Sequence, residues 1–273
     1  MHQLLNAFKP TEITLPNGKK VLEPKSPVLL YVLLVLALTF FFIELTGFNL
    51  QTIQRRGHQF FVLLENMFPP NGNYAPSVWV PLIDTVKMSL LGTFIGAMIS
   101  IPFALLASTN ITKSKFLILF SRFLFSLIRT IPTLVTALVA TFILGFGTTA
   151  GTVAIALFTF GFVGKLLYEQ IETVDMGAYE AVESMGGNKS RAFAVAIIPQ
   201  VMPRFLSNTL FCFEGNVRHA AILGMVGAGG IGLIFNTQLA LRNYGNVGMI
   251  LMMMFAVVFI IEVISRFTRS KLV

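Results

Sequence analysis

A polar segment between Glu169 and Ser190 interrupts an otherwise very apolar sequence. Within it, the stretch MGAYEAVESMGGNK predicts a short helix from Ala178 to Met185, because it is rich in helix-forming residues and ends in two glycines. Small apolar side chains would line one face of this helix, and carboxylates would line the other. Such a helix suits a groove on another protein, and the alternative is a solvated connection between two apolar stretches.

A second group of ionisable residues lies inside an apolar stretch further along the chain. Glu214 and Arg218 are four residues apart, so a helix would bring them into contact, with Asn216 and His219 nearby. Ionisable side chains at membrane depth are costly, and they usually pair with one another or line a pathway. Two interpretations stay open: a structural ion pair at the end of a helix, or a guanidinium of Arg218 that binds a tetrahedral oxyanion. We expect His219 to be a packed or interfacial histidine.

The sequence GAGGIG follows this group and contains four closely spaced glycines. It resembles a dinucleotide-binding fingerprint, but no strand of a βαβ unit precedes it. In an apolar chain, glycines allow a kinked or re-entrant backbone whose N–H groups can face an anion, or they allow close packing between subunits. We expect a gate-forming segment here, made of Gly227, Gly229, Gly230 and Gly232.

No pattern for catalysis or metal binding accompanies these groups. The G-x-x-x-x-G-K-[ST] loop that holds nucleotide phosphates is missing, as are HExxH and GxSxG, and the three histidines are scattered. Cys212 lies within an apolar stretch and is expected to be a small packing residue. The sequence therefore predicts no catalytic residue, no metal and no cofactor.

The composition places these groups in a helical membrane protein. Of the 273 residues, 55% are hydrophobic and 12% are charged, whereas about 25% are charged in soluble domains. The net charge of +8 would suggest a nucleic-acid ligand in a soluble protein. Here the cations lie at the ends of apolar runs and form no basic stripe, so nucleic-acid binding is excluded.

Charge-free stretches predict an all-α membrane protein with six spans, preceded by a polar tail over residues 1–25. The first span lies within residues 26–46. The second runs from Met88 to Thr112, and the stretch Thr130–Gly164 holds the third and fourth spans, divided at Gly145–Gly151. The fifth follows Arg191 towards Glu214, and the sixth runs from Asn243 to Ile261.

Lysines and arginines predict the orientation of these spans. They gather in the tail, in the loops around Thr112–Arg122 and Lys165–Arg191, and at the C-terminus, so this face should be cytosolic. The segment Thr46–Val80 then lies outside as a turn-rich loop. The third helix should begin near Lys115. Its Arg122 either reaches lipid phosphates or pairs with the acids of the polar loop.

The polar segment resembles the cytosolic motif of ABC importer permeases, in which Glu-Ala-Ala is followed by three residues, Gly, nine residues and Ile-x-Leu-Pro. The residues in register are Glu180, Ala181, Val182, Gly186 and Pro199, and Gly187 shares the glycine turn. Val182 replaces the second alanine, and Ala196 and Ile198 stand where isoleucine and leucine are usual. By this resemblance, a coupling helix at about residues 175–190 docks in a groove of an ATPase subunit.

Further segments are similar to the permease of phosphonate ABC importers, over most of the chain from about Phe61 to Arg266. They include PQVMP, FEGNVRHA and GMVGAGGIG. The resemblance implies a type I ABC importer permease (MetI-like) fold, with the transmembrane domain at residues 80–268. It also implies a substrate path or gate that contains Glu214, Asn216, Arg218 and the four glycines of GAGGIG.

The same resemblance implies the partners and the location of the chain. A second permease copy would form a homodimer with it in the bacterial plasma (inner) membrane, where both are multi-pass proteins. Two cytosolic ABC ATPase subunits would bind ATP and Mg²⁺, and an extracytoplasmic binding protein would deliver the phosphonate.

Two alternatives remain at this point. The same architecture could import phosphite, phosphate or an amino acid such as methionine. A secondary transporter or channel is a different class, but it needs intramembrane carboxylates for ion coupling, and few lie within the predicted spans.

Overall fold

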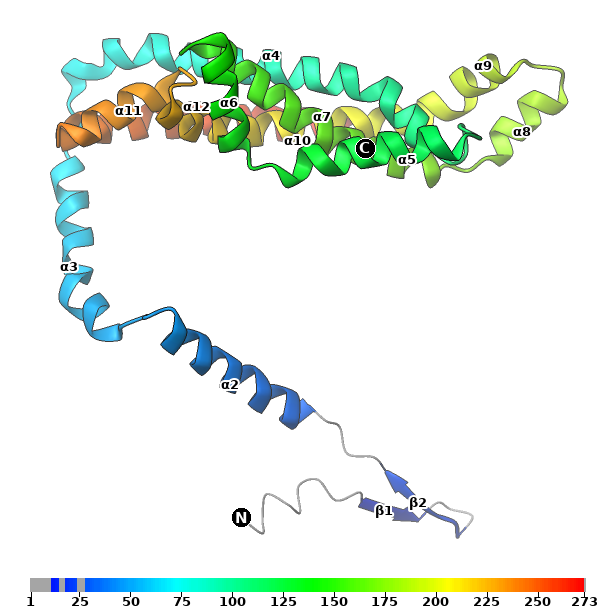
Figure 1. Ribbon diagram of the computed structural model, residues 1–273, viewed down its shortest axis with the longest axis horizontal. Helices are drawn as coiled ribbons and strands as arrows, with labels where there is room; N and C mark the ends of the chain where they lie inside the picture. Colours follow the sequence, from blue (N-terminus) through cyan, green and yellow to red (C-terminus); the bar gives the residue numbers. More distant parts are fainter. Residues whose placement is uncertain (1–10, 15–17, 24–27, 273) are drawn as a thin grey trace. The chain divides into compact units, whose positions relative to one another are not determined.

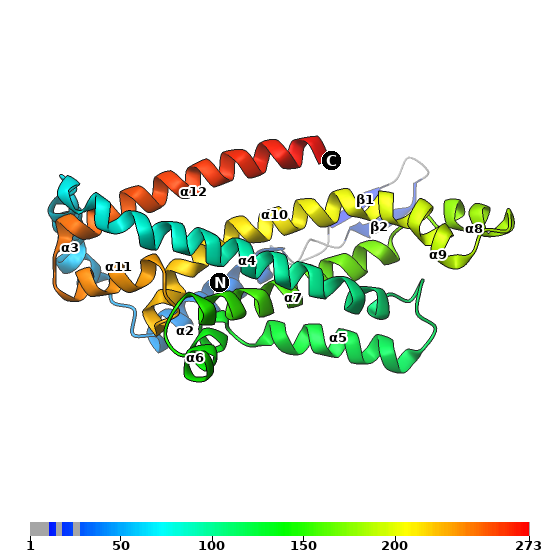
Figure 2. The same ribbon diagram turned by 90° about the horizontal axis from the view of Figure 1, so that it is seen from above.

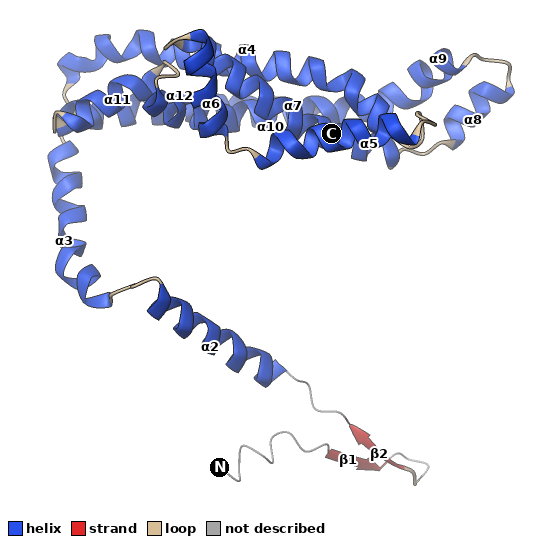
Figure 3. Ribbon diagram, viewed as in Figure 1, coloured by secondary structure: helices blue, strands red, loops and turns tan. Residues whose placement is uncertain are grey.

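A computed structural model of the protein describes residues 11–14, 18–23 and 28–272 (Figure 1). The chain divides into two compact units, Met1–Phe61 and Val62–Val273, and each is described by itself. Helices make up most of the described chain (Figure 3), so the expected helical architecture is confirmed.

The first unit holds a short β-ribbon and an apolar helix. Strand β1 (Thr11–Thr14) pairs antiparallel with β2 (Lys20–Glu23), an element that the sequence did not predict. Helix α2 (Val28–Leu45) has 18 residues and is about 27 Å long at 1.5 Å per residue, close to the thickness of a hydrocarbon core. It coincides with the expected first span. The other residues of the predicted tail, and residues 26 and 27 of that span, lie outside the described residues.

The predicted outer loop Thr46–Val80 is wrong over much of its length, because it contains helix α3 (Leu50–Met67). Leu50, Ile53, Phe60 and Leu64 recur at helical spacing and place apolar side chains on one face, with polar and basic residues on the other. The turns of this segment are shorter: one lies at residues 46–47, and the sequence FPPNGNY forms another, which contains the short 3-10 helix η1 (Gly72–Tyr74). The sequence analysis missed α3 because it sought charge-free runs rather than helical periodicity.

Helix α4 (Ala75–Ala107) begins more than three turns before the predicted start of the second span at Met88. Lys87, which directly precedes the predicted span, lies within the helix and forms an ion pair at 3.7 Å with Asp84, about one turn away. An ion pair on a helix surface can occupy the outer end of a span without interrupting the backbone hydrogen bonds.

The third helix, which was expected to begin near Lys115, is divided into two helices. Helix α5 (Lys115–Thr130) packs along α4 and α7 (Thr148–Glu172), and α6 (Thr133–Leu144) is bent from it by 91°. The bend occurs at Pro132, which cannot continue a helical hydrogen-bond ladder. The expected start at Lys115 is confirmed, and α5 lies within the bundle, where it buries Phe125 and Ser121.

The core of the second unit is the contact between α4 and α7, with α10 (Ile198–Leu223) beside both (Figure 2). Glycines on α4 make this contact close. A Cβ atom on Gly92 would lie 2.8 Å from the carbonyl oxygen of Thr152, and one on Gly96 would overlap the carbonyl oxygen of Ala156. The small-xxx-small spacing of Gly92 and Gly96 therefore marks a true helix contact.

The last helices complete the bundle. After α10 comes a short 3-10 turn, η3 (Gly224–Val226), and then α11 (Ile231–Ala240) and α12 (Tyr244–Leu272). Helices α4, α7 and α12 are long and apolar enough to span a membrane, and three bent pairs (α2 with α3, α5 with α6, and Lys189–Val226 with α11) can each supply one more. The described residues thus accommodate the six predicted spans.

The close α4–α7 contact predicts that Gly96→Ala destabilises the protein by about 1–3 kcal/mol, because the added methyl group forces the helices apart. Thermal unfolding of the purified protein in detergent measures the effect. The control is Gly215→Ala, because Gly215 lies inside α10 and has no neighbour within 4 Å of an added Cβ atom. Equal midpoints for the two variants would contradict the assignment.

Candidate functional site

Helix α8 (Gly177–Ser184) protrudes beyond the bundle together with α9 (Lys189–Ala192), at what we call the α8 end (Figures 1 and 2). None of the α8 residues is buried. Glu180, Ala181 and Met185 are exposed, whereas Met176 and Tyr179 pack back against the bundle. The predicted helix over Ala178–Met185 is confirmed to within one residue at each end.

Two glycines end α8, as the sequence predicted. Gly186 has a φ of +86°, a conformation that favours glycine. Gly187 donates its N–H to the carbonyl of Val182 at 3.0 Å, and the Val182 side chain packs so closely that a Cβ atom on Gly187 would lie 2.8 Å from it. The contact between Val182 and Gly187 therefore stabilises the turn, while Glu180 and Ala181 are exposed to the outside.

The segment after α9 is a π-helix, η2 (Phe193–Ile197), which leads into Pro199 at the start of α10. Gln200 donates its side-chain amide to the carbonyl of Ala196 at 2.7 Å. Wide π-turns inside α-helices occur often at functional sites. The second half of the predicted coupling motif thus forms the joint between α9 and α10.

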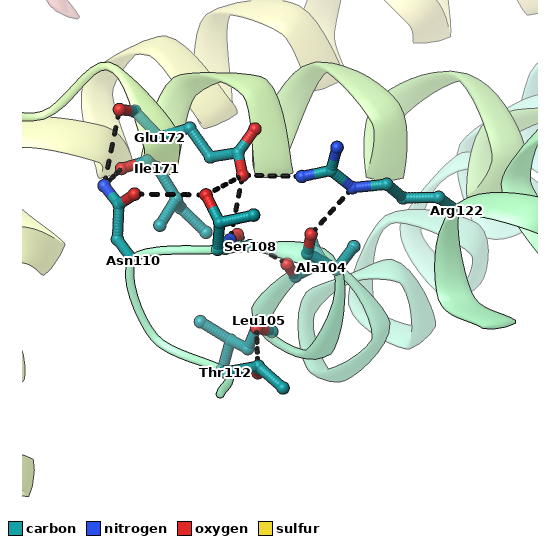
Figure 4. Close-up of polar contacts among 10 residues, drawn as sticks. Ala104, Leu105, Ser108, Asn110, Thr112, Arg122, Ile171 and Glu172 are labelled. Atoms are coloured by element: carbon teal, nitrogen blue, oxygen red, sulfur yellow. Dashed lines mark hydrogen bonds and ion pairs between the residues drawn. The ribbon is translucent and has the colours of Figure 1, made fainter. Parts of the chain in front are cut away.

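A group of polar residues at the α8 end ties together α4, α5 and α7 (Figure 4). Glu172, the last residue of α7, accepts from the backbone N–H of Thr109 at 2.8 Å and from its hydroxyl at 2.5 Å. Arg122 of α5 donates to the same carboxylate oxygen at 2.5 Å and to the carbonyl of Ala107 at 3.0 Å. We call Thr109, Arg122 and Glu172 the Glu172 clamp.

Two further contacts support the Glu172 clamp. Asn110 donates to the carbonyl of Ile171 at 3.0 Å, and the Arg122 guanidinium lies 4.8 Å from the centre of the Tyr168 ring. Of the two predicted roles for Arg122, pairing with the polar loop is therefore confirmed. Sequence reasoning did not find Thr109 and Asn110, although a polar pair directly after an apolar helix is a signal that could have found them.

Further along the bundle, Glu214 of α10 lies between two arginines. It is 5% exposed. Its carboxylate accepts from Arg218 at 2.8 Å, which confirms the predicted pair, and from Arg269 of α12 at 3.2 Å. The guanidinium of Arg269 also lies 5.6 Å from the centre of the Phe211 ring. We call Glu214, Arg218 and Arg269 the Glu214 triad.

Asn216 lies inside the protomer and is 1% exposed. Its amide donates to the hydroxyls of Thr93 on α4 at 2.8 Å and Thr159 on α7 at 2.9 Å. The side chain thereby links three helices, and the structure does not place it beside the exposed Arg218. Cys212 is buried one turn away, 3.7 Å from the Thr159 hydroxyl, in agreement with its predicted packing role.

The exposed face of α10 differs from that of α12 in polarity. The face of α10 includes Arg204, Phe211, Arg218, His219 and Ile222 at helical spacing, whereas α12 exposes Met252, Phe255, Phe259, Val263 and Phe267. A helix face that carries only apolar side chains can lie against lipid, whereas a face with charged side chains usually meets a partner or water. His219 packs edge-on against Phe158, with ring centres 6.0 Å apart, as expected of a packed histidine.

Residues 227–230, between η3 and α11, interrupt the helical backbone, as predicted. Gly227, Gly229 and Gly230 have φ values of +81°, +76° and +72°, and α11 is bent from α10 by 53°. The segment packs against the turn before α7, where the N–H of Gly147 donates to the carbonyl of Gly227 at 3.0 Å. Gly232 lies against Gly224 and Ala221, where a side chain would not fit.

No group of histidine, cysteine and carboxylate side chains that could hold a metal occurs in the described part of the chain. Two observations bear on the kind of protein. A short exposed helix protrudes from one end of a membrane bundle, and residues 100–270 match the family described as "Binding-protein-dependent transport system inner membrane component". The chain belongs to this family. It is therefore a multi-pass inner-membrane component of an ABC transport system.

Curated relatives carry names from phosphorus transport. The phosphate-import permease protein PhnE of Mycolicibacterium smegmatis is 35% identical over 212 residues, which cover 77% of this chain and 40% of that protein. The chain thus spans less than half of the length of this relative. The phosphite transport system permease protein PtxC of Stutzerimonas stutzeri is 34% identical over 193 residues, 70% of each chain.

Solved structures of ABC transporters share the fold. The MetNI methionine ABC transporter in an inward-facing conformation has a TM-score of 0.64 at 18% identity, covering 74% of this chain and 99% of the matched chain. An amino acid ABC transporter has a TM-score of 0.62 at 23% identity, and the match covers 73% of this chain and 95% of the matched chain. The chain has the MetI-like fold of a type I ABC importer permease.

The Glu172 clamp predicts a graded loss of stability. Glu172→Ala removes the acceptor of Thr109 and Arg122 and should destabilise by about 1–3 kcal/mol, because bonds to charged groups are among the stronger ones. Glu172→Gln keeps an acceptor and should lose less. Glu169→Ala is the control, because its i,i+4 pair with Lys165 lies on the surface and should contribute about 0.5 kcal/mol or less. Thermal unfolding in detergent measures the stability of the three variants. If Glu169→Ala unfolds at the lowest temperature of the three, the prediction is wrong.

Proposed function

We propose that the chain is the permease subunit of an ATP-driven importer for phosphonates or a closely related phosphorus oxyanion. A second copy of the chain, two cytosolic ABC ATPase subunits and an extracytoplasmic binding protein would complete the transporter. The observation that carries this proposal is the exposed helix α8 at the end of the bundle. It presents Glu180 and Ala181 outward and is followed directly by the glycine turn at Gly186.

The energy for transport would come from the ATPase partners. The sequence has no phosphate-binding loop, so ATP and Mg²⁺ would bind to another polypeptide, and this chain would perform no catalysis. Helix α8 fits the role of the coupling helix, since short helices with a small apolar face dock in grooves. The positive-inside rule supports a cytosolic position for the α8 end, where Lys113, Lys165, Lys189 and Arg191 gather.

The Glu172 clamp would carry movements of α8 into the bundle. It joins the ends of α4 and α7 and the body of α5 through bonds of 2.5–3.0 Å to Glu172 and Arg122. α8 begins five residues after Glu172, at Gly177. A displacement of α8 by the ATPase would therefore reach three helices together rather than one. The π-helix at Phe193–Ile197 would connect the same displacement to α10.

The translocation path would run along the exposed face of α10, between two copies of the chain. This face presents Arg204 and Arg218, which are unsuited to lipid, while the exposed side chains of α12 are apolar over residues 251–264. The glycines Gly227, Gly229, Gly230 and Gly232 would form the gate at the outer end. Asn216 would support the path indirectly, because its bonds to Thr93 and Thr159 fix α10 in the bundle. The transmembrane domain, expected at residues 80–268, would start at Ala75, where α4 begins.

The names of the relatives favour a phosphorus oxyanion over an amino acid. The relatives named for phosphate import and phosphite transport match 77% and 70% of this chain. The probable D-methionine permease MetI of Vibrio cholerae matches 35% of it. A guanidinium such as that of Arg218 can bind a tetrahedral oxyanion through two parallel hydrogen bonds.

Helix α8 predicts that variants at Glu180 and Gly186 are uncoupled. Glu180→Ala removes an exposed charge, and Gly186→Val strains a backbone with a φ of +86°. Both should lower substrate uptake by about tenfold or more, the factor that a docking loss of 1.4 kcal/mol produces, while the protein stays in the membrane. Uptake by cells and immunodetection in membranes measure the two quantities. The control Glu169→Ala, at the same end but outside α8, should transport normally, and full uptake by both α8 variants would refute the coupling role.

The cargo is tested with the complete transporter in proteoliposomes. Methylphosphonate, phosphite, phosphate and methionine are offered in turn to the cognate binding protein, and binding and stimulated ATPase activity are measured. We expect binding and stimulation with at least one phosphorus oxyanion and none with methionine. Stimulation by methionine alone would exclude the proposed cargo and leave the permease assignment intact. Uptake by this chain without an ATPase would instead indicate a secondary transporter.

A further inference from the structure

The Glu214 triad holds one carboxylate and two guanidinium groups, and it therefore carries a net charge of +1. The carboxylate of Glu214 is almost fully buried between α10 and α12, and each of its oxygens accepts from a different arginine. A single arginine would already neutralise the glutamate. The second arginine makes the cluster cationic around an almost fully buried carboxylate, where an excess charge is costly, so it calls for a role beyond neutralisation.

The two arginines differ in their surroundings. The side chain of Arg218 is 47% exposed and lies on the polar face of α10, whereas that of Arg269 is 26% exposed. Arg269 also lies over the Phe211 ring, and its Nε is buried and finds no acceptor among the described residues. Arg269 is thus held in place by packing, and Arg218 is the arginine that can turn outward.

We propose that Arg218 exchanges Glu214 for the passing oxyanion, and that Arg269 is a positioning residue that keeps Glu214 neutralised during the exchange. This inference rests on the proposed function, because it assumes an anionic cargo on the exposed face of α10. In the resting arrangement Arg218 is paired with Glu214. When an oxyanion arrives, Arg218 binds it, and Glu214 keeps its bond to Arg269.

The energetic argument concerns the buried carboxylate. Removing one partner of a buried ion pair is strongly destabilising, because the other charge is left uncompensated. If Arg218 were the sole partner of Glu214, each oxyanion would have to overcome this penalty. With Arg269 in place, Arg218 can leave the Glu214 carboxylate and bind the cargo oxyanion. Glu214 stays paired with Arg269, so no charge is left unpaired.

The sequence alone did not reveal this arrangement. Arg269 lies 55 residues after Glu214, in a C-terminal stretch whose cations were attributed to the positive-inside rule. Only the packing of α12 along α10 brings the two side chains together.

The test compares charge-matched variants of the full transporter in proteoliposomes. In Arg269→Gln, Arg218 is the remaining arginine partner of Glu214 in the triad, so it cannot leave without exposing an unpaired buried carboxylate. This variant should lower uptake of the phosphorus oxyanion by at least about tenfold. Glu214→Gln combined with Arg269→Gln frees Arg218 again and should restore uptake to within about threefold of wild type. Glu214→Gln combined with Arg218→Gln has the same net charge but lacks the exposed arginine, and it should stay inactive.

A purely structural role gives the opposite pattern. If the triad only fastens α12 to α10, Glu214→Gln will not rescue Arg269→Gln, and the two double variants will be equally defective, which overturns the proposal. Arg269→Lys keeps the charge and replaces the glutamine variant if that variant does not assemble. It should transport within about tenfold of wild type, because the ammonium still neutralises Glu214 but does not stack on the Phe211 ring as the guanidinium does. Complete loss of uptake by this variant would also overturn the proposal. A wild-type transporter that takes up no phosphorus oxyanion refutes the proposed cargo instead.

Discussion

The close contact between α4 and α7 is the constraint on which the rest of the structure depends. Because lipid provides no hydrophobic force between helices, their association relies on tight packing, and Gly92 and Gly96 allow the two backbones to approach closely. The Asn216 amide then reaches Thr93 and Thr159 on these two helices at 2.8 and 2.9 Å. Wider spacing would break both bonds and leave polar groups unpaired in the core. The glycines therefore fix the position of α10, and with it the position of Arg218.

Both ends of α7 take part in the proposed function. At its start, the turn that contains Gly147 binds the glycine segment before α11, and at its end Glu172 forms the clamp with Thr109 and Arg122. α7 thus connects the α8 end with the proposed gate through one continuous helix. A continuous helix transmits displacement along its axis without loss at a joint, whereas the α5–α6 pair is bent by 91° and cannot do so.

Local features of the structure could be predicted, and contacts between distant segments could not. Helix α8 and its turn at Gly186 follow from helix-forming residues and a glycine pair, and the Glu214–Arg218 pair follows from i,i+4 spacing. Helix α3 was missed because its apolar residues are periodic rather than contiguous. The pairing of Arg269 with Glu214, like that of Thr109 with Glu172, depends on helix packing, which no local pattern of residues encodes.

The π-helix at Phe193–Ile197 determines how far α10 is rotated about its axis relative to the segment that contains α8 and α9. A π-turn holds one residue more than an α-turn, and one residue corresponds to a rotation of about 100° about the helix axis. The direction in which the face with Arg204 and Arg218 points, relative to α8, is therefore determined by this one extra residue. Converting the wide turn into an α-turn would leave α8 and α10 intact and would point the same arginines at a different neighbour.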